Sequence, residues 1–525
     1  MSRVLIDLVA TGGLALAAAA QLVRWLRVLQ REHYDPAATL RFLARWSSAP
    51  AGPGPAAALR RVISVSVLAV LAWVGAVATG LTWWAVGVAV VYGVACPRGL
   101  GLRGRTGPLR WTRRLSAAAG ASVLVTAMVL GAGVALGRPW PFAGAAVFGV
   151  PVIVSAAAAA LAPFEARRAR VFVERAAARL ARVRPTVVAI TGSYGKTSTK
   201  VHLAHLLGSD AGVVASPASF NNRAGLSRAI NENLADGTRV FIAEMGTYGP
   251  GEIRELCEWC PPDVAVITAL GPVHLERMGS LDVIESAKFE VTERARVVVV
   301  NVDDERLAQW PERLATSGVR VRRAGSRDAN ADVRVALEGE RWRVTVDGVA
   351  LADVVAPAGV HATNVACALA GALALGADPS ALAERLASLA AVEHRSQVST
   401  APSGVVVVDD TFNANPQSAA AAVALLTASC AGRRVVVTPG LVELGPAASA
   451  ANRELGARVA AAGDELVVVG RTNARALADG YDSSSPGPLR ARRVAHRDDA
   501  VAWVRSSLVA GDGVLYLNDL PDHYP

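Results

Sequence analysis

The chain has 525 residues, of which 52% are hydrophobic, and its formal net charge at pH 7 is +10. This length is enough for several domains, but the mean hydropathy of +0.34 is too high for an ordinary soluble enzyme of this size. We therefore expect part of the chain to lie in a membrane. The arginines lie beside apolar segments rather than among stacking aromatic residues, so we predict no nucleic-acid partner.

The cysteines indicate a reducing compartment. There are five of them, scattered along the chain, and an odd number does not suit a disulfide framework. Cys257 and Cys260 form a lone Cys-x-x-Cys pair with no second pair or histidines at ligand spacing. We expect buried thiols there rather than a zinc site.

The first third of the chain is predicted to cross a membrane several times. Apolar segments occupy residues 4–23, 62–96, 115–136 and 143–162. The second segment is too long for one crossing, and a turn at residues 80–82 divides it, which gives five spans. The first span lacks the basic start and small-residue cleavage site of a signal peptide, so we interpret it as an anchor.

The arginines fix the predicted orientation of these spans. They concentrate in residues 24–61, 98–114 and 167–184, whereas the joints near residues 81 and 139 carry little charge. Arginine-rich segments stay on the cytoplasmic side of a membrane. Five spans meet this condition when the N-terminus lies outside and everything from residue 164 onward lies inside. We therefore predict a multi-pass protein of the cell membrane with cytoplasmic catalytic domains.

The pattern changes after the last span. Residues 164–184 alternate arginine with alanine, leucine and valine, which is typical of an amphipathic helix on a bilayer surface that ends before Pro185. A solvated linker helix is the alternative. Short β-branched runs near residues 187, 240, 264, 297, 405, 435 and 466 then alternate with helical segments, which indicates a parallel α/β architecture. Residues 326–355 are expected to form a small strand-rich insert.

A phosphate-binding loop follows the first of these runs. The string TGSYGKTS at residues 191–198 comes after an apolar strand and opens a helix. Glycines let the backbone approach an anion closely, and the first amides of a helix carry a partial positive charge. Lys196 is placed to reach the terminal phosphates and Thr197 to bind Mg²⁺. The predicted nucleotide-binding residues are Gly192, Ser193, Gly195, Lys196, Thr197 and Ser198.

Two further polar residues follow strands. Glu244 ends an apolar run, and His274 lies in a loop after the next one. Ligands of an open α/β sheet bind at the carboxyl ends of its strands, where a carboxylate beside a phosphate loop can hold Mg²⁺. Taken singly, a glutamate such as Glu244 is more often a cap or an ion-pair partner, and a histidine such as His274 is more often an ordinary polar loop residue.

Taken together, the motifs resemble those of the Mur ligase family, most of all its D-alanyl-D-alanine-adding branch. These ATP-dependent enzymes join an amino acid or peptide to a carboxylate. Besides the phosphate loop, the matching strings are NNRAG (221–225), EMG (244–246), HLE (274–276), SAKFE (286–290), NVDD (301–304), EHR (393–395) and DDTFNANP (409–416). They occur in the family's order, and the resemblance covers residues 186 to about 460.

This resemblance implies the domain organisation and the cofactors. An α-helical transmembrane region at residues 1–163 and a basic amphipathic linker helix at 164–185 would precede two α/β domains. The first, at residues 186–392, would be the P-loop parallel-sheet ATPase domain, and the second, at 393–525, a Rossmann-like C-terminal domain. ATP and Mg²⁺ would be used to activate a carboxylate as an acyl phosphate, which an amine then captures.

The resemblance also implies roles for individual residues. Glu244 and His274 would hold Mg²⁺ with Thr197, and Asn301 would approach the adenine. Lys288 stands where the family carries a carbamylated lysine, and pairing with phosphate is the alternative role for its amine. Arg395 would neutralise the γ-phosphate. Asp410 and Asn413 would reach the nucleotide when the domains close.

The chain departs from the family where acceptors are recognised. Membrane spans replace the family's UDP-sugar domain, His361 is displaced from its usual place beside Asn364, and the terminal substrate-binding string is missing. We therefore expect a membrane-tethered ligase that adds D-alanyl-D-alanine or a similar amine to a cell-wall precursor, soluble or lipid-linked. One alternative is an amide ligase like the poly-γ-glutamate synthetases. Another, of a different class, is a transporter or scaffold driven by an ATPase.

Overall fold

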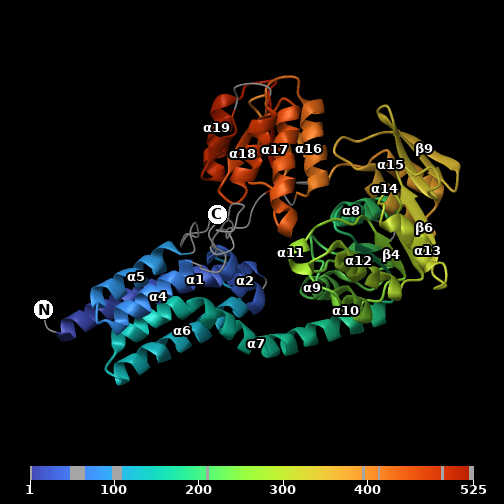
Figure 1. Ribbon diagram of the computed structural model, residues 1–525. Helices are drawn as coiled ribbons and strands as arrows, with labels where there is room; N and C mark the ends of the chain where they lie inside the picture. Colours follow the sequence, from blue (N-terminus) through green and yellow to red (C-terminus); the bar gives the residue numbers. More distant parts are fainter. Residues whose placement is uncertain are drawn as a thin grey trace. The chain divides into compact units, whose positions relative to one another are not determined.

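The computed structural model describes residues 3–32, 34–47, 65–96, 109–208, 212–392, 397–411, 414–485 and 490–518. The chain forms two compact units, Met1–Arg168 and Ala169–Asp519 (Figure 1). The first is helical, and the second contains two α/β sheets. All five cysteines are free, and Cys257 and Cys260 are buried, as predicted.

The helical unit contains the predicted apolar segments as helices. Its elements are α1 (Arg3–Arg31), α2 (Pro36–Ser47), α4 (Val65–Ala78), α5 (Thr82–Ala95), α6 (Arg113–Ala135) and the first part of α7 (Pro139–Val183). The turn predicted at residues 80–82 lies between α4 and α5, where Gly80 has a φ of 75° that favours glycine. The basic stretch after the first span also contains α2, which the sequence pattern did not indicate.

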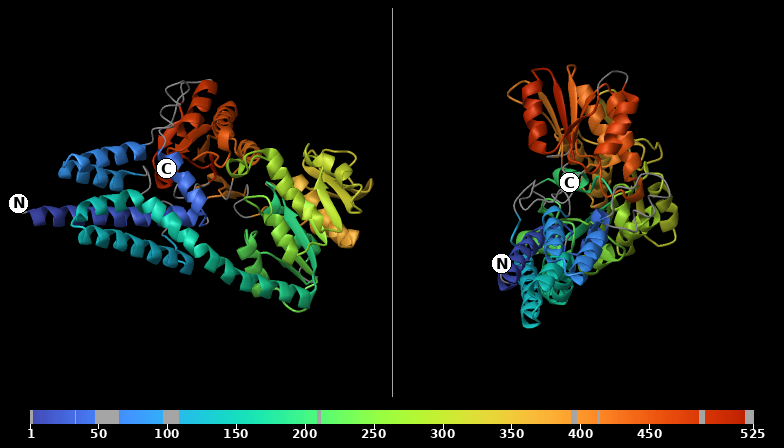
Figure 2. Two further views of the ribbon diagram at one scale, coloured as in Figure 1. Left: turned by 60° about the horizontal axis from the view of Figure 1, so that its bottom comes forward. Right: turned by 60° about the vertical axis from the view of Figure 1, so that its left-hand side comes forward.

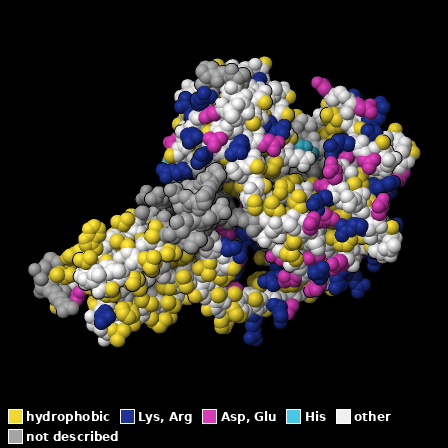
Figure 3. Space-filling model, viewed as in Figure 1, with side chains coloured by type: hydrophobic (Ala, Val, Ile, Leu, Met, Phe, Trp, Pro, Cys, Tyr) yellow, Lys and Arg dark blue, Asp and Glu magenta, His cyan; other side chains and the backbone are white. Residues whose placement is uncertain are grey.

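The surface of this unit is apolar. Among the described residues, three helices are long and apolar enough to cross a membrane, namely Val4–Arg31, Arg113–Ala135 and Pro139–Val183. Helices α4 and α5 have 14 residues each and are shorter than a typical span. Large hydrophobic side chains such as Leu16, Trp84 and Val134 face outward, and Figure 3 shows hydrophobic atoms over most of this surface.

Helix α7 differs from the prediction. We expected a span ending at residue 162 and a separate linker helix at 164–185, but α7 continues unbroken for 45 residues through Pro151 and Pro163 (Figure 2). The alanine-rich sequence around both prolines favours helix strongly enough to continue past the hydrogen bonds that they remove. The helix ends at Val183, close to Pro185, as the restriction on residues before proline requires.

The first α/β part of the second unit is built on nine strands in the order β2-β3-β1-β4-β5-β6-β7-β8-β9. Pairing is parallel from β2 to β7 and antiparallel in β7-β8-β9. The strands are β1 (Thr186–Thr191), β2 (Val213–Ala215), β3 (Val240–Glu244), β4 (Val264–Ile267), β5 (Val297–Asn301), β6 (Arg320–Gly325), β7 (Val333–Glu338), β8 (Arg341–Val346) and β9 (Val349–Val355). The expected insert at 326–355 is therefore not separate, because its strands extend this sheet from β6.

Helices cover both faces of this sheet. They are α8 (Lys196–Leu207), α9 (Arg223–Asn233), α10 (Glu252–Trp259), α11 (Leu275–Met278), α12 (Leu281–Phe289), α13 (Trp310–Leu314), α14 (Ala362–Ala374) and α15 (Pro379–Leu386), with 3-10 turns at Glu290–Glu293 and Leu307–Gln309. Alternate residues of β1 enter opposite cores: Val188 and Ile190 pack with α8 and α14, whereas Val187 and Ala189 pack with α7, α9 and α10. Strand β1 lies between β3 and β4, so the strand order reverses there and a ligand crevice is expected.

The second α/β part has six strands in the order β10-β11-β15-β12-β13-β14, all parallel except β10. Its elements are β10 (Gln397–Thr400), β11 (Val406–Asp410), α16 (Pro416–Ser429), β12 (Arg434–Thr438), a 3-10 turn at Gly445–Ala447, α17 (Ala448–Ala461), β13 (Glu465–Val469), α18 (Ala474–Ser484), β14 (Arg492–Val494), α19 (Arg497–Ser507) and β15 (Gly513–Leu517). Helices α16, α17 and α18 pack on one face and α19 on the other. This is the parallel α/β architecture that the sequence predicts.

Candidate nucleotide and catalytic site

The phosphate loop has the predicted strand-loop-helix form. Strand β1 ends at Thr191 and α8 begins at Lys196. The loop needs glycine at two positions: Gly192 has a φ of 148° and Gly195 a φ of 78°. A Cβ atom would lie 2.1 Å from Thr268 Oγ1 at Gly192 and 2.3 Å from Asn364 Oδ1 at Gly195. No side chain caps the first amides of α8, so they are available to an anion such as a phosphate group.

Hydrogen bonds hold this loop to the segment that follows β4. Ser193 N donates to Ala269 O at 2.7 Å, and the Ser193 hydroxyl bonds to the Gly271 backbone at 3.0 and 3.1 Å. Lys196 Nζ donates to Gly192 O at 2.7 Å, so its ammonium group lies over the loop. The half-buried Ser198 follows in the first turn of α8. These residues fit the triphosphate that the sequence predicts.

Glu244 lies beside the loop, and both of its carboxylate oxygens accept hydrogen bonds. Oε2 accepts from Thr197 Oγ1 and Lys200 Nζ, each at 3.0 Å, and Oε1 accepts from Asn221 Nδ2 at 3.0 Å. Burial alone would raise the pKa of Glu244, but Lys200, Lys196 and the hydrogen bonds hold it below its ordinary value. Glu244 is therefore an anion in neutral solution, as a magnesium ligand must be.

Sequence reasoning missed Lys200 and gave Asn221 no role. Lys200 is one helical turn after Lys196 and is almost fully buried, and its Nζ also donates to Ala218 O. A signal was available in the helical spacing, because two lysines four residues apart share a face of α8. Asn364, which was set aside because His361 is displaced, also belongs here through its contact with Gly195.

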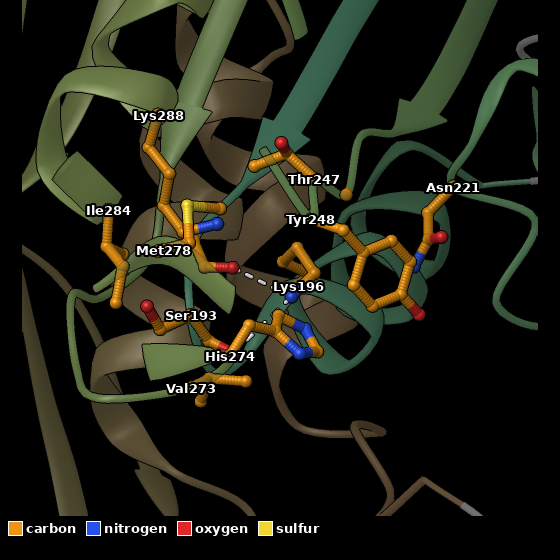
Figure 4. A pocket seen from close by; sticks show the side chains of 12 residues that line it. Ser193, Lys196, Asn221, Thr247, Tyr248, Val273, His274, Met278, Ile284 and Lys288 are labelled. Atoms are coloured by element: carbon orange, nitrogen blue, oxygen red, sulfur yellow. Dashed lines mark hydrogen bonds between the residues drawn. The ribbon is translucent and has the colours of Figure 1, made fainter. Parts of the chain in front are cut away.

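A cavity lies in front of the loop (Figure 4). Among the residues that line it are Ser193, Lys196, Asn221, His274 and Lys288. Lys288 comes from α12, is buried, and makes no hydrogen bond to any residue that the structure describes. Burial and, secondarily, Lys196 lower the pKa of Lys288 well below its ordinary value. This shift makes it easier for the ammonium group to lose its proton, and the neutral amine is the form that can react with carbon dioxide.

His274 borders the same cavity. It has a φ of 58° at the start of α11, and its ring lies 4.6 Å from the ring of Tyr248. Its Nδ1 atom lies 2.5 Å from Glu443 Oε2, which comes from the loop after β12. The sequence analysis assigned no role to Glu443. Because Nδ1 is engaged, a metal ion could bind His274 only through Nε2.

The described residues contain no group of three or more histidine, cysteine, aspartate or glutamate side chains placed to hold a metal. No hydrogen bond joins Glu244 to His274 there. Magnesium commonly uses one or two carboxylates, with waters and substrate phosphates completing its shell. Glu244 and the Thr197 hydroxyl fit that pattern, whereas the role of His274 as a ligand stays a prediction.

The other predicted residues lie apart from the cavity or outside the described chain. Asn301 is buried at the end of β5, where its Nδ2 donates to Thr268 O at 2.6 Å and its Oδ1 accepts from Asp303 N at 3.0 Å. Asp410 is buried at the end of β11 and does not line the cavity. Arg395 and Asn413 lie outside the described residues. Their roles toward the nucleotide stay predictions.

Two family models match the chain: the Mur ligase middle domain at residues 190–373, and the Mur ligase glutamate ligase domain at residues 394–517. The chain is 35% identical over 356 residues to the UDP-N-acetylmuramoyl-tripeptide–D-alanyl-D-alanine ligase of Mycobacterium tuberculosis, covering 63% of this chain and 69% of that protein. It is 29% identical over 275 residues to the ligase of the same name from Bacillus subtilis, and the match covers 52% of this chain and 59% of that protein.

Solved structures show the same fold. The MurF ligase of Thermotoga maritima in complex with ADP superposes with a TM-score of 0.57 at 24% identity, covering 67% of this chain and 80% of that one. MurF from Acinetobacter baumannii superposes with a TM-score of 0.57 at 22% identity, and the match covers 67% of this chain and 77% of that one. The similarity begins after the helical unit in the family models, at residue 190.

Proposed function

The chain belongs to the Mur ligase family of ATP-dependent peptide ligases, and we propose that it joins D-alanyl-D-alanine to a muramyl-peptide precursor of the cell wall at the membrane. One observation carries the catalytic part: Lys196, Lys288 and the phosphate loop share a single cavity. The choice of amine rests on the names of relatives such as the Mycobacterium tuberculosis ligase, to which the chain is 35% identical over 356 residues.

The reaction couples three substrates. An oxygen of the acceptor carboxylate bonds to the γ-phosphorus of ATP, and the bond from that phosphorus to the ADP oxygen breaks. The amine nitrogen then bonds to the carbonyl carbon, inorganic phosphate leaves, and the nitrogen loses a proton. Positioning and charge stabilisation supply most of the acceleration in such phosphoryl transfers. The products are an amide, ADP and phosphate.

The chain's own residues supply that positioning. The amides opening α8 and the Lys196 ammonium hold the terminal phosphates, and Thr197 and Glu244 hold Mg²⁺. When bound, Mg²⁺ neutralises charge on the phosphate oxygens. Lys288, whose pKa burial lowers, is suited to carbamylation, which turns a cation into a carboxylate-like group. His274 and Asn221 complete the wall where the acyl group is to lie.

The helical unit anchors this ligase in the membrane, with the ligase domains in the cytoplasm. Two observations support this part of the proposal: the long apolar helices with outward-facing hydrophobic side chains, and the concentration of arginines in residues 24–61, 98–114 and 167–184 of the sequence. A membrane-resident ligase whose match to the family begins at residue 190, after the helical unit, can take its acceptor from the bilayer. The proposed acceptor is therefore lipid-linked.

The test uses the full-length chain purified in detergent, with ATP and Mg²⁺. A soluble and a lipid-linked muramyl tripeptide are each offered D-alanyl-D-alanine, D-alanine or glutamate, and products are read by mass spectrometry. We expect the lipid-linked acceptor to gain the mass of D-alanyl-D-alanine less one water. Addition of glutamate instead would contradict the proposed amine. ATP turnover without any ligated product would contradict ligation itself and favour a transporter or scaffold.

A further inference from the structure

Helix α1 carries two buried arginines near its C-terminal end. Arg24 is 7% exposed and Arg27 4% exposed, and they lie one turn apart on the same face of the helix. A guanidinium group keeps its charge at every physiological pH. Buried charges in proteins are normally paired with an opposite charge, because leaving water is costly for an unpaired ion.

Arg24 lacks such a pairing. Its Nη1 donates to Gly93 O at 2.7 Å, and its Nε has no hydrogen-bond partner among the described residues. No described aspartate or glutamate forms a salt bridge with it. Gly93 lies near the C-terminal end of α5, and a helix end offers only about half a negative charge. Among the described residues, this carbonyl group is therefore the one hydrogen-bond acceptor that Arg24 meets.

Helices α1 and α5 are joined closely beside Arg24. Gln21 Nε2 donates to Cys96 O at 2.6 Å and to Tyr92 O at 3.3 Å, and Gln21 Oε1 accepts from Trp25 Nε1 at 2.8 Å. Helices α1 and α5 approach closely, because a Cβ atom on Gly93 would lie 3.0 Å from the Ala17 Cβ. Gln21 Nε2 thus joins α1 to the end of α5, where Arg24 also donates to Gly93 O.

The position of Arg24 along α1 indicates which kind of anion it binds. The first predicted span ends near residue 23, so Arg24 follows directly at its cytoplasmic end in the proposed orientation. Lipid phosphates lie at that level of a bilayer. The planar fork of arginine matches the oxygens of a phosphate group.

We propose that Arg24 binds the phosphate group of a membrane lipid. One step of this inference rests on the proposed function. Where the bound lipid is the acceptor, Arg24 holds the phosphate that joins the muramyl peptide to its lipid. An ordinary phospholipid headgroup carries the same chemistry. Competition between the two kinds of lipid for binding to the protein distinguishes them.

The experiment measures binding of radiolabelled polyprenyl diphosphate to the full-length chain in nanodiscs of neutral lipid. An excess of MgADP is present throughout, because the phosphate loop would otherwise also bind diphosphate. Arg24→Gln should weaken binding at least about tenfold, and Arg24→Lys should weaken it less. The matched control is Arg41→Gln, because Arg41 is an exposed arginine of the same unit that is paired with Asp35. The Arg41→Gln protein should bind polyprenyl diphosphate as tightly as the wild type does.

A second comparison needs no variant, so it stands even if Arg24→Gln fails to fold. Polyprenyl diphosphate should bind the wild type at least about tenfold more tightly than the phosphate-free polyprenol. If phosphatidylglycerol displaces polyprenyl diphosphate only weakly, the bound lipid is the lipid-linked acceptor. If phosphatidylglycerol binds as tightly as polyprenyl diphosphate, the bound lipid is an ordinary phospholipid. Equal binding of the polyprenol, equal competition by inorganic diphosphate, or unchanged binding to Arg24→Gln would overturn the proposal. No ligation occurs in this assay, so its outcome is independent of the ligase test.

Discussion

Lys200 Nζ lies 3.0 Å from Glu244 Oε2, and both side chains are almost fully buried, at 3% and 1% exposure. The two residues come from α8 and the end of β3, so the ion pair joins the phosphate-loop helix to the neighbouring strand. It keeps Glu244 ionised beside Thr197, where a magnesium ligand is needed. Lys200 is therefore a positioning residue for the proposed metal site.

Breaking this pair should destabilise the second unit. Lys200→Met leaves a buried carboxylate without its cation, which typically costs about 3 to 5 kcal/mol. The double variant Lys200→Met/Glu244→Gln should cost less than the sum of the single changes, because no lone charge remains. Urea unfolding followed by circular dichroism measures both. Arg228→Met, in an exposed pair with Glu232, is the control and should change stability by less than about 1 kcal/mol. Equal effects of Lys200→Met and Arg228→Met would contradict this account.

Gly195→Ala should weaken nucleotide binding. The added methyl group would lie 2.3 Å from Asn364 Oδ1, at a φ of 78° that alanine rarely adopts. We expect ADP affinity, measured by calorimetry, to fall at least about tenfold. Combining it with Asn364→Ala should restore part of the affinity by removing the clash while the backbone strain remains. Gly371→Ala in α14 meets only ordinary contacts and should leave affinity unchanged. A Gly195→Ala protein that binds ADP normally would show that the loop does not hold the phosphates.

Stability should fall in acid partly because of His202. Burial, with help from His205 and His361, lowers the pKa of His202 to about 4. In the unfolded chain its pKa is about 6.5, so between these values the unfolded state binds more protons and stability falls as pH falls. At pH 5 the loss is about 2 kcal/mol, and above pH 6.5 there is none. The thermal midpoint of His202→Gln should therefore change less between pH 7.5 and pH 5 than that of the wild type. Identical changes would contradict the burial argument.

The hydrogen bond between His274 and Glu443 should affect ligation more than nucleotide binding. Glu443 holds Nδ1 of His274, a histidine that lines the cavity and forms no hydrogen bond with the phosphate loop among the described residues. We expect Glu443→Ala to lower the ligation rate about tenfold, since a hydrogen bond to a charged group contributes roughly 1.5 to 3 kcal/mol. ADP affinity should stay within about twofold. If Glu443→Ala lowered the ligation rate and the ADP affinity by the same factor, Glu443 would act in nucleotide binding instead.

Local rules predicted the parts of this site that depend on neighbouring residues. The glycines at 192 and 195, the strand before them and the helix after them follow from backbone conformation alone. The turn at Gly80 follows from the same rules. The placement of Glu244 at a strand end followed from the parallel pattern, because the carboxyl ends of such strands meet at one edge.

Contacts between distant residues could not be predicted in this way. Lys200 meets Glu244 across 44 positions and His274 meets Glu443 across 169, so each pair depends on the packing of whole elements. Strands β7 to β9 were expected as an insert because their pattern does not reveal the open edge of β6. The two prolines of α7 suggested a boundary that the surrounding alanines override.

The central claim is that the cavity around Lys196 activates a carboxylate with ATP so that an amine can capture it. The most direct measurement is ligated product formed from lipid-linked muramyl tripeptide, D-alanyl-D-alanine, ATP and Mg²⁺ by the wild type and by Lys196→Ala, with folding checked by thermal unfolding. The account predicts product from the wild type and less than about 1% of that rate from a folded Lys196→Ala protein. Undiminished ligation by Lys196→Ala would contradict it.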